Sequence, residues 1–302
     1  MAKHRLSDYI ALDRRHALAK GAQIAERSHG SALFADVSGF TSLTEALVRT
    51  LGERRGAEAL PRYLNQVYDA LISDVNRFGG SVIGFAGDAI TCWFNTDDGY
   101  HALICALSMQ QSMEQFHDIE IAADIRVTLA MKVAIATGPV RRFAVGDPDI
   151  QLIDVVAGET LTRMAKAEHE AERGEIVLDQ LAALHLHERV HIQQLRDVSE
   201  VDSVSEVDSN VNVATNATAT TTSTSVRAST SESPEGSSST LTLTPQATER
   251  YAVVDKFTMG LTVFSTAPEQ PQPEDINPRL PEDDYQALRN WILPPVYDRL
   301  KA

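Results

Sequence analysis

The sequence is poor in cysteine, in aromatic residues and in long apolar runs. Only Cys92 and Cys105 occur among 302 residues, both in apolar surroundings, so a disulfide framework is excluded. No stretch approaches the roughly 18 consecutive apolar residues that a transmembrane helix needs. The first residues, MAKHRLSDYIALDRR, lack the apolar run of a signal peptide. We therefore expect a cytoplasmic protein without a membrane span.

Basic residues are also scarce relative to acidic ones. The chain has 27 Lys and Arg against 42 Asp and Glu, which gives a formal net charge of -15. A surface of this sign repels nucleic-acid backbones and anionic membranes, so neither is expected as a partner. A small anionic ligand held locally with metal ions is still compatible with this charge. Hydrophobic residues make up 43% and charged residues 23%, a composition typical of a globular protein with a packed core.

One long segment lacks the residues that build a core. Residues 199–248 contain no aromatic residue, Ile, Met or Cys and are dominated by Ser and Thr, which predicts a disordered insertion. Residues 250–257 again have the pattern of a strand. We therefore divide the chain into an N-terminal segment at 1–30, a domain at 31–258 interrupted by this insertion, and a tail at 259–302. The tail is Pro-rich and ends in an amphipathic segment, which we expect to lead towards a second domain.

Before the insertion, the hydrophobic periodicity alternates between strand and helix. We expect, in chain order, a strand at 32–36, a helix at 57–77, a hairpin of strands at 81–86 and 89–94, a helix at 98–116, strands at 125–136 and 140–145 that turn at Gly138-Pro139, a helix at 159–170 and a strand at 175–178. This βαββαβ-like order with extra hairpins predicts an α+β fold, with an antiparallel or mixed sheet and helices on one face.

Two acidic residues lie in tight, glycine-rich surroundings. Asp36 occurs in Phe-Ala-Asp-Val-Ser-Gly-Phe-Thr and Asp88 in Phe-Ala-Gly-Asp-Ala. Asp36 ends a predicted strand and Asp88 occupies a hairpin turn, so an antiparallel sheet can make them neighbours. Two carboxylates at adjoining strand ends suit Mg²⁺, which also takes phosphate oxygens. Gly39 and the helix N-terminus after it favour a phosphate. The alternative, a helix cap and a turn residue, explains each aspartate singly but not the pair.

Two motifs resemble a known family. The stretch FADVSGFTSLTE, followed by GGSVIGFAGDAITCWF, resembles the class III nucleotidyl cyclase domain, the catalytic unit of adenylate and guanylate cyclases. The later stretch from Met131 to Asp179 is similar to the second half of that domain. The resemblance covers residues 31–198 and 249–258, and is strongest to the first of two cyclase domains in soluble-type, ATPase-linked adenylate cyclases. It implies a ferredoxin-like nucleotidyl cyclase fold whose domains pair head to tail, with the active site between them.

The resemblance also implies roles for particular residues. Asp36 and Asp88 would hold two Mg²⁺ or Mn²⁺ ions, with the carbonyl of Val37 as a further ligand. One ion would lower the pKa of the ribose 3′-hydroxyl and the other would stabilise the leaving pyrophosphate. The implied reaction converts ATP to cyclic AMP and pyrophosphate, in intracellular signal transduction. The triphosphate would lie against four backbone amides, those of Ser38, Gly39, Phe40 and Thr41.

The purine-reading side departs from the family pattern. Members that read adenine carry a Lys four residues before the second metal-binding Asp, where this chain has Gly84. The transition-state Asn and Arg lie four and eight residues after a helix-preceding Gly. Counting from Gly158 gives Thr162 and Lys166, and Lys166 lacks the bidentate fork of an arginine. We therefore expect a metal-binding half that needs a second cyclase domain, in a longer chain or a separate subunit. The choice between ATP and GTP stays open.

Two other functions compete with this interpretation. A catalytically degenerate pseudo-cyclase would bind nucleotide or a partner without turnover. A zinc hydrolase is suggested by His187-Glu188-Arg189-Val190-His191, which matches HExxH. That motif needs a helix with both His on one face and a third ligand. Val190 and Ile192 alternate as in a strand, so we expect a solvated surface there. Arg141-Arg142 are expected at a charged hairpin turn.

Overall fold

The computed structural model describes residues 9–122, 124–198, 249–257 and 288–301. The chain divides into two compact units, Met1–Asp197 with Arg250–Ala302, and Val198–Glu249. The described elements belong almost entirely to the first unit. The insertion predicted at 199–248 and the Pro-rich part of the tail lie outside the described residues.

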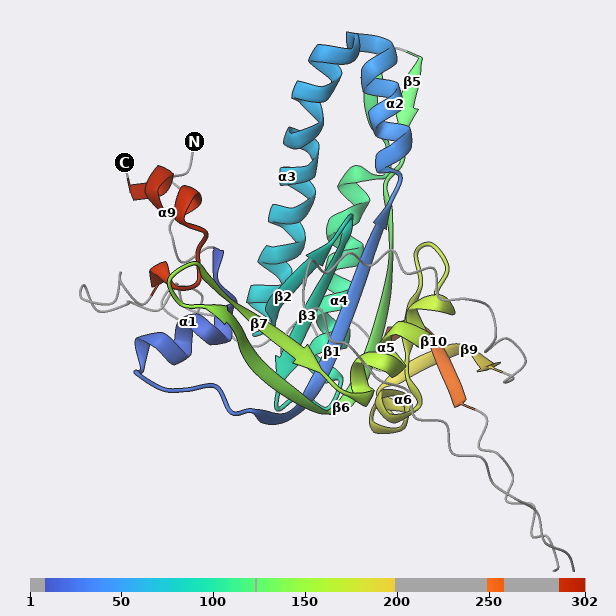
Figure 1. Ribbon diagram of the computed structural model, residues 1–302. Helices are drawn as coiled ribbons and strands as arrows, with labels where there is room; N and C mark the ends of the chain where they lie inside the picture. The colour runs from blue at the N-terminus through green and yellow to red at the C-terminus, as the bar shows by residue number, and fades with distance from the viewer. Residues whose placement is uncertain (1–8, 123, 199–248, 258–287, 302) are drawn as a thin grey trace, which may run out of the picture. The chain divides into compact units, whose positions relative to one another are not determined.

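The described helices and strands are interspersed along the chain (Figure 1). Their order is α1 (Leu12–Ala19), β1 (Arg27–Ser38), α2 (Phe40–Leu51), α3 (Glu53–Arg77), β2 (Ser81–Ala86), β3 (Ala89–Asn95), α4 (Tyr100–Met113), the 3₁₀ helix η2 (Glu114–Phe116), β4 (Ile119–Ala122), β5 (Ile125–Val127), β6 (Ala130–Asp147), β7 (Gln151–Ala157), α5 (Glu159–His169), β8 (Ile176–Leu178), α6 (Gln180–Leu186), β9 (Val190–Val198), β10 (Glu249–Phe257) and α9 (Pro294–Lys301).

The central strands have the connectivity of a ferredoxin-like fold. Strands β2, β3, β1 and β6 are neighbours in that order, and β1 is antiparallel to both β3 and β6. With α2 and α3 after β1 and α4 after β3, this is a βαββαβ unit (Figure 1). Strand β8 extends the sheet in parallel with β6, and β10 pairs with β8 in the antiparallel sense. The predicted α+β class with a mixed sheet is confirmed.

Successive side chains along β1 point to opposite faces of the sheet. Leu33, Ala35 and Val37 are buried in the main core with side chains of α2, α3 and α4. Phe34 and Asp36 therefore face the other side, where α5 packs against β1 and β6. The expectation that the helices cover one face is wrong. Helices α2, α3 and α4 cover one face of the sheet, and α5 buries its apolar side chains against the opposite face.

The chain does not turn at Gly138-Pro139. Strand β6 continues through both residues, with Gly138 opposite Gly30 and Pro139 opposite His29. Strand β1 begins at Arg27 and offers a pairing edge over this whole length, so β6 stays extended and turns only before β7. The strand expected at 125–136 is likewise divided, since β5 pairs with β4 in a separate two-stranded sheet.

Arg141 and Arg142 consequently lie inside β6 rather than at a turn. Arg141 forms an ion pair with Glu26 at 3.1 Å. The side chain of Arg142 is buried and pairs with Asp13 of the N-terminal helix and with Asp154 of β7. The two arginines therefore link the β6–β7 hairpin to α1 and to the segment before β1 through ion pairs.

The last strands complete the sheet, and residues near the two termini pack together. The strand expected at 250–257 is present as β10, and β9 and β10 are neighbours in the sheet, so the chain returns to the same sheet after residue 248. Near the termini, Ile10, Leu288, Ile292 and Tyr297 form a separate small apolar cluster. None of the described helices is both long and apolar enough to cross a membrane.

Candidate active site

Asp36 and Asp88 lie close together where β1 meets the β2–β3 turn. Asp36 is opposite Ala89, the first residue of β3, and Asp88 occupies the turn just before it. The backbone N–H of Val37 donates to the carbonyl oxygen of Asp88 over 3.4 Å. Strand β1 runs on to Ser38 because β6 pairs with it that far, so the expectation that Asp36 ends the strand is wrong.

The two carboxylates give this corner an excess of negative charge. Burial raises the pKa of Asp36, the charge of Asp88 raises it further, and the cation of Lys132 opposes the rise. Burial and the same two carboxylates raise the pKa of the Tyr68 phenol on α3. The Tyr68 hydroxyl donates to the carbonyl of Gly87 over 3.4 Å, which ties α3 to the turn. A cation at this corner would relieve the repulsion.

The donor set fits a divalent cation of the magnesium type. In the described part of the chain, no group of three or more His, Cys, Asp or Glu side chains could hold a metal ion. Asp36 and Asp88 offer two carboxylates only. Mg²⁺ in nucleotide sites takes one or two carboxylates and completes its shell with waters and substrate phosphate oxygens. The carboxylate pair at Asp36 and Asp88 therefore fits such an ion.

The turn after β1 leads directly into a helix N-terminus. Gly39 precedes α2 with φ +108°, and a Cβ there would lie 2.6 Å from the carbonyl oxygen of Thr128, so only glycine fits. The first intrahelical bond runs from the Leu43 N–H to the Gly39 carbonyl over 2.9 Å. The N–H groups of Phe40 and Thr41 therefore have no partner within the helix. Phe40 is buried, whereas Thr41 is exposed.

Sequence reasoning missed three charged residues beside these groups. Lys132 lies opposite Asp36 on β6, with its Nζ 3.9 Å from Asp36 Oδ2. The same Nζ is 2.6 Å from Oε1 of Glu168 on α5. Arg173 donates from Nε to the Ser38 hydroxyl over 2.7 Å. The available signal was Lys132 itself, a single charged residue within an otherwise apolar run.

The positions predicted to match the family's adenine-reading Lys and its transition-state Asn and Arg lie on β2 and α5. Thr162 and Lys166 are both exposed on α5. Gly84 on β2 lines a cavity of about 360 Å³ together with residues of α5, among them Met164 and Glu168. A Cβ at Gly84 would meet no atom within 4 Å, so the position has room for a side chain that the sequence does not supply.

The two histidines of the HExxH match do not share a helix face. Helix α6 ends at Leu186, and His191 lies on β9 with its Nδ1 2.9 Å from Asp255 Oδ1. His187 contacts the carbonyl of Leu184 over 2.7 Å. The strand interpretation of this segment is confirmed, and the arrangement a zinc hydrolase needs is not formed.

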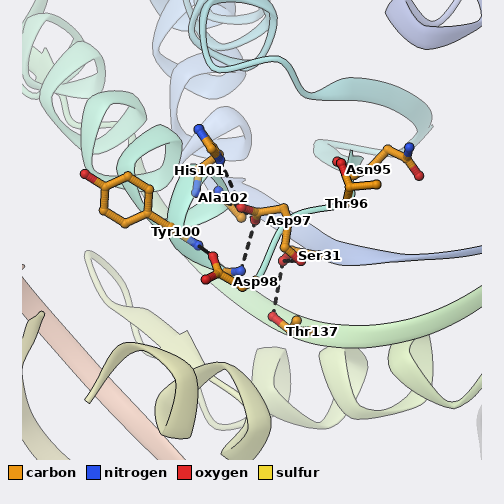
Figure 2. Close-up of polar contacts among 10 residues, drawn as sticks. Ser31, Asn95, Thr96, Asp97, Asp98, Tyr100, His101, Ala102 and Thr137 are labelled. Carbon is orange, nitrogen blue, oxygen red and sulfur yellow. Dashed lines mark hydrogen bonds and ion pairs between the residues drawn. The ribbon is translucent and has the colours of Figure 1, made fainter. Parts of the chain in front are cut away.

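A second polar cluster anchors the N-terminus of α4 (Figure 2). The buried carboxylate of Asp97 accepts the backbone N–H groups of Gly99, His101 and Ala102 over 3.1, 3.0 and 3.3 Å and contacts His101 Nδ1 at 3.1 Å. Burial raises the pKa of Asp97, but the hydrogen bonds from His101 and Ala102 outweigh it and lower the pKa overall. The hydrogen bond to Asp97 raises the pKa of His101. This cluster caps the helix and is structural.

Residues 23–229, more than half of the chain, match the family described as Adenylate and Guanylate cyclase catalytic domain. The chain belongs to this family. The predicted resemblance to nucleotidyl cyclases is confirmed, and the corner formed by Asp36 and Asp88 belongs to a cyclase catalytic domain. The closer likeness to the first domain of tandem cyclases stays a prediction.

Several named proteins are similar to this cyclase domain. Adenylate cyclase type 10 of Rattus norvegicus is 29% identical over 154 residues, which are 49% of this chain and 9% of that protein. Adenylate cyclase 1 of Rhizobium meliloti (strain 1021) is 27% identical over 110 residues, 35% of this chain and 15% of that protein. The chain thus spans a small part of the length of these relatives.

Solved cyclase structures are also similar to the chain. The adenylyl cyclase CyaB from P. aeruginosa has a TM-score of 0.49 and 19% identity, covering 76% of this chain and 95% of that chain. The guanylyl cyclase Cya2 has a TM-score of 0.47 and 21% identity, covering 60% and 89%.

Proposed function

We propose that this cyclase domain is the metal-binding half of an adenylate cyclase site, which converts ATP to cyclic AMP and pyrophosphate together with a second cyclase domain. The observation that carries the proposal is the pairing of Asp36 and Asp88 beside the N-terminus of α2. Adenylate cyclases among the relatives favour ATP as the substrate. GTP is the alternative, because the purine-reading positions are not filled. We place the domain at residues 31–258, between an N-terminal segment and a tail.

The chain's own residues would hold and orient the substrate. Asp36 and Asp88, with the carbonyl of Val37, would hold two Mg²⁺ or Mn²⁺ ions. When bound, these ions lower the pKa of the ribose 3′-hydroxyl and neutralise charge on the transferring phosphoryl group. The amides of Ser38, Gly39, Phe40 and Thr41 would orient the triphosphate.

The turn that carries these amides is fixed before substrate binds. The hydroxyl of Ser38 donates to the carbonyl of Ala130 over 3.2 Å and accepts from Arg173. The backbone N–H of Val37 donates to the carbonyl of Asp88, which links the two segments that carry the aspartates. Such preorganisation reduces the entropy lost when the triphosphate is positioned.

An exposed apolar surface supports a protein partner. On one face of the β6–β7 hairpin, Phe143 lies opposite Val155 and Val145 opposite Ile153, and all four side chains are 36 to 54% exposed. The other face carries Arg142 and Asp154, which pair with residues of α1. An apolar patch on a hairpin whose other face is covered is typical of a binding surface. The missing purine-reading groups make a second cyclase domain the expected partner.

Reconstitution tests the proposal. The purified chain is mixed with a cyclase domain that carries the Lys, Asn and Arg this chain lacks, and cyclic AMP is measured with ATP and Mn²⁺. We expect product only in the mixture, and none when the chain carries Asp36→Ala. The departures at Gly84, Thr162 and Lys166 favour the pseudo-cyclase as the second candidate. That alternative predicts binding of ATP and Mn²⁺ without product in any pairing.

A further inference from the structure

Lys132 stands between two carboxylates that belong to different elements. It projects from β6 opposite Asp36, and its Nζ is 3.9 Å from Asp36 Oδ2 and 2.6 Å from Glu168 Oε1. The Nζ also lies 3.4 Å from the backbone carbonyl of Glu168. The three side chains are each between 24 and 28% exposed, so solvent screens their charges only in part.

The distances show which carboxylate holds the lysine. Glu168 is in direct contact with the ammonium group, while Asp36 is at the limit of an ion pair. Both charges therefore lie close enough to Asp36 to act on a cation bound there. A divalent cation at Asp36 and Asp88 would be repelled by the ammonium group and attracted by Glu168. The Lys132–Glu168 ion pair therefore lies where its two charges can change the affinity of Asp36 and Asp88 for a cation.

We propose that Lys132 and Glu168 are positioning residues that set the divalent-cation affinity of the Asp36/Asp88 site. The ammonium group of Lys132 competes with the cation for the carboxylate of Asp36. Glu168 pairs with this ammonium group and keeps it away from Asp36, so that the cation can bind. The inference rests on the proposed function, since it concerns the same site. It differs from a purely structural ion pair between β6 and α5, because Lys132 and Glu168 have opposite effects on cation affinity.

Mn²⁺ titration of the nucleotide-free full chain by calorimetry tests this inference without measuring activity. Lys132→Gln should tighten Mn²⁺ binding on the order of three- to tenfold, and Glu168→Gln should weaken it by a similar factor. Lys132→Arg should keep the wild-type affinity, since it keeps the charge. Two exposed positions provide matched controls: Lys20→Gln at the end of α1 and Glu159→Gln at the start of α5 change the net charge equally and should leave affinity unchanged. Thermal unfolding without Mn²⁺ shows that each variant folds.

The outcomes separate this inference from the proposed function. If wild type binds Mn²⁺, Asp36→Asn abolishes binding, Lys132→Gln tightens it and Glu168→Gln weakens it, the inference stands; the reverse pair of shifts overturns it. If those two variants shift affinity in the same direction or match their controls, the inference is wrong while the metal site stands. If wild type binds no Mn²⁺, or Asp36→Asn binds it equally well, the metal assignment in the proposed function fails and the inference fails with it.

Discussion

At the scale of single residues, the two aspartates carry the proposed chemistry. Asp36→Ala or Asp88→Ala should reduce cyclic AMP formation in a reconstituted pair by at least about 10²-fold, because each removes a ligand from a charge-dominated transition state. The fold should survive, since Asp36 is partly exposed and Asp88 is exposed. Cyclic AMP assays and thermal unfolding measure the two effects. Wild-type turnover in either variant would show that the metal assignment is wrong.

Gly39 is the residue on which the geometry of the turn before α2 depends. Gly39→Ala should lower the free energy of unfolding by at least about 1–3 kcal/mol, because φ is +108° and the new Cβ would meet the carbonyl of Thr128. Gly84→Ala is the matched control: it has open space and should change stability by less than about 1 kcal/mol, with stabilisation the expected sign. Urea unfolding compares them, and equal losses would contradict the assignment of strain to Gly39.

At the scale of elements, the cap of α4 gives stability a pH dependence. The folded-state pKa of His101 is raised, so its contribution is complete below its unfolded pKa of about 6.5 and is lost as the pH rises through the folded value. Asp97 has a lowered pKa, so its contribution is present above about pH 4 and is lost only as the pH falls through the folded value.

Between pH 6 and pH 8 only the contribution of His101 should therefore change. We expect the free energy of unfolding of wild type to fall over this range by more than that of His101→Gln. Urea unfolding at several pH values measures the difference. A His101→Gln profile parallel to wild type would contradict the assigned coupling to Asp97.

At the scale of the whole molecule, the chain alone should be almost inactive. A symmetric pair would contribute Gly84, Thr162 and Lys166 to each site, with no adenine-reading Lys, no Asn and no Arg fork. An arginine acting on a transferring phosphoryl group is worth roughly 10³–10⁵ in rate, so turnover should lie near background. Binding of Mn²⁺ and ATP should persist, which calorimetry can measure alongside a cyclic AMP assay. Strong cyclic AMP formation by the purified chain would mean that other residues supply these groups.

Local chemistry allowed several parts of this structure to be predicted from sequence. Gly87-Asp88 between two apolar runs specified the β2–β3 hairpin, because a tight glycine turn and period-two patterning act over neighbouring residues. The helical spacing at 57–77 specified most of α3 for the same reason. Asp36 and Asp88 were found as a pair because each lies in a distinctive short motif, and antiparallel pairing then places the motifs together.

Other features were decided only by contacts between distant segments. Gly138-Pro139 has the composition of a turn, yet the edge of β1 keeps β6 extended through it, because backbone pairing over a long strand outweighs local preference. Lys132 and Glu168 belong to different elements, and only the packing of α5 on the Asp36 face of the sheet brings them together. The sequence by itself determined which residues can do the chemistry, since residue type and spacing are local properties. The tertiary structure decided which charges surround them, because that depends on which elements share a face.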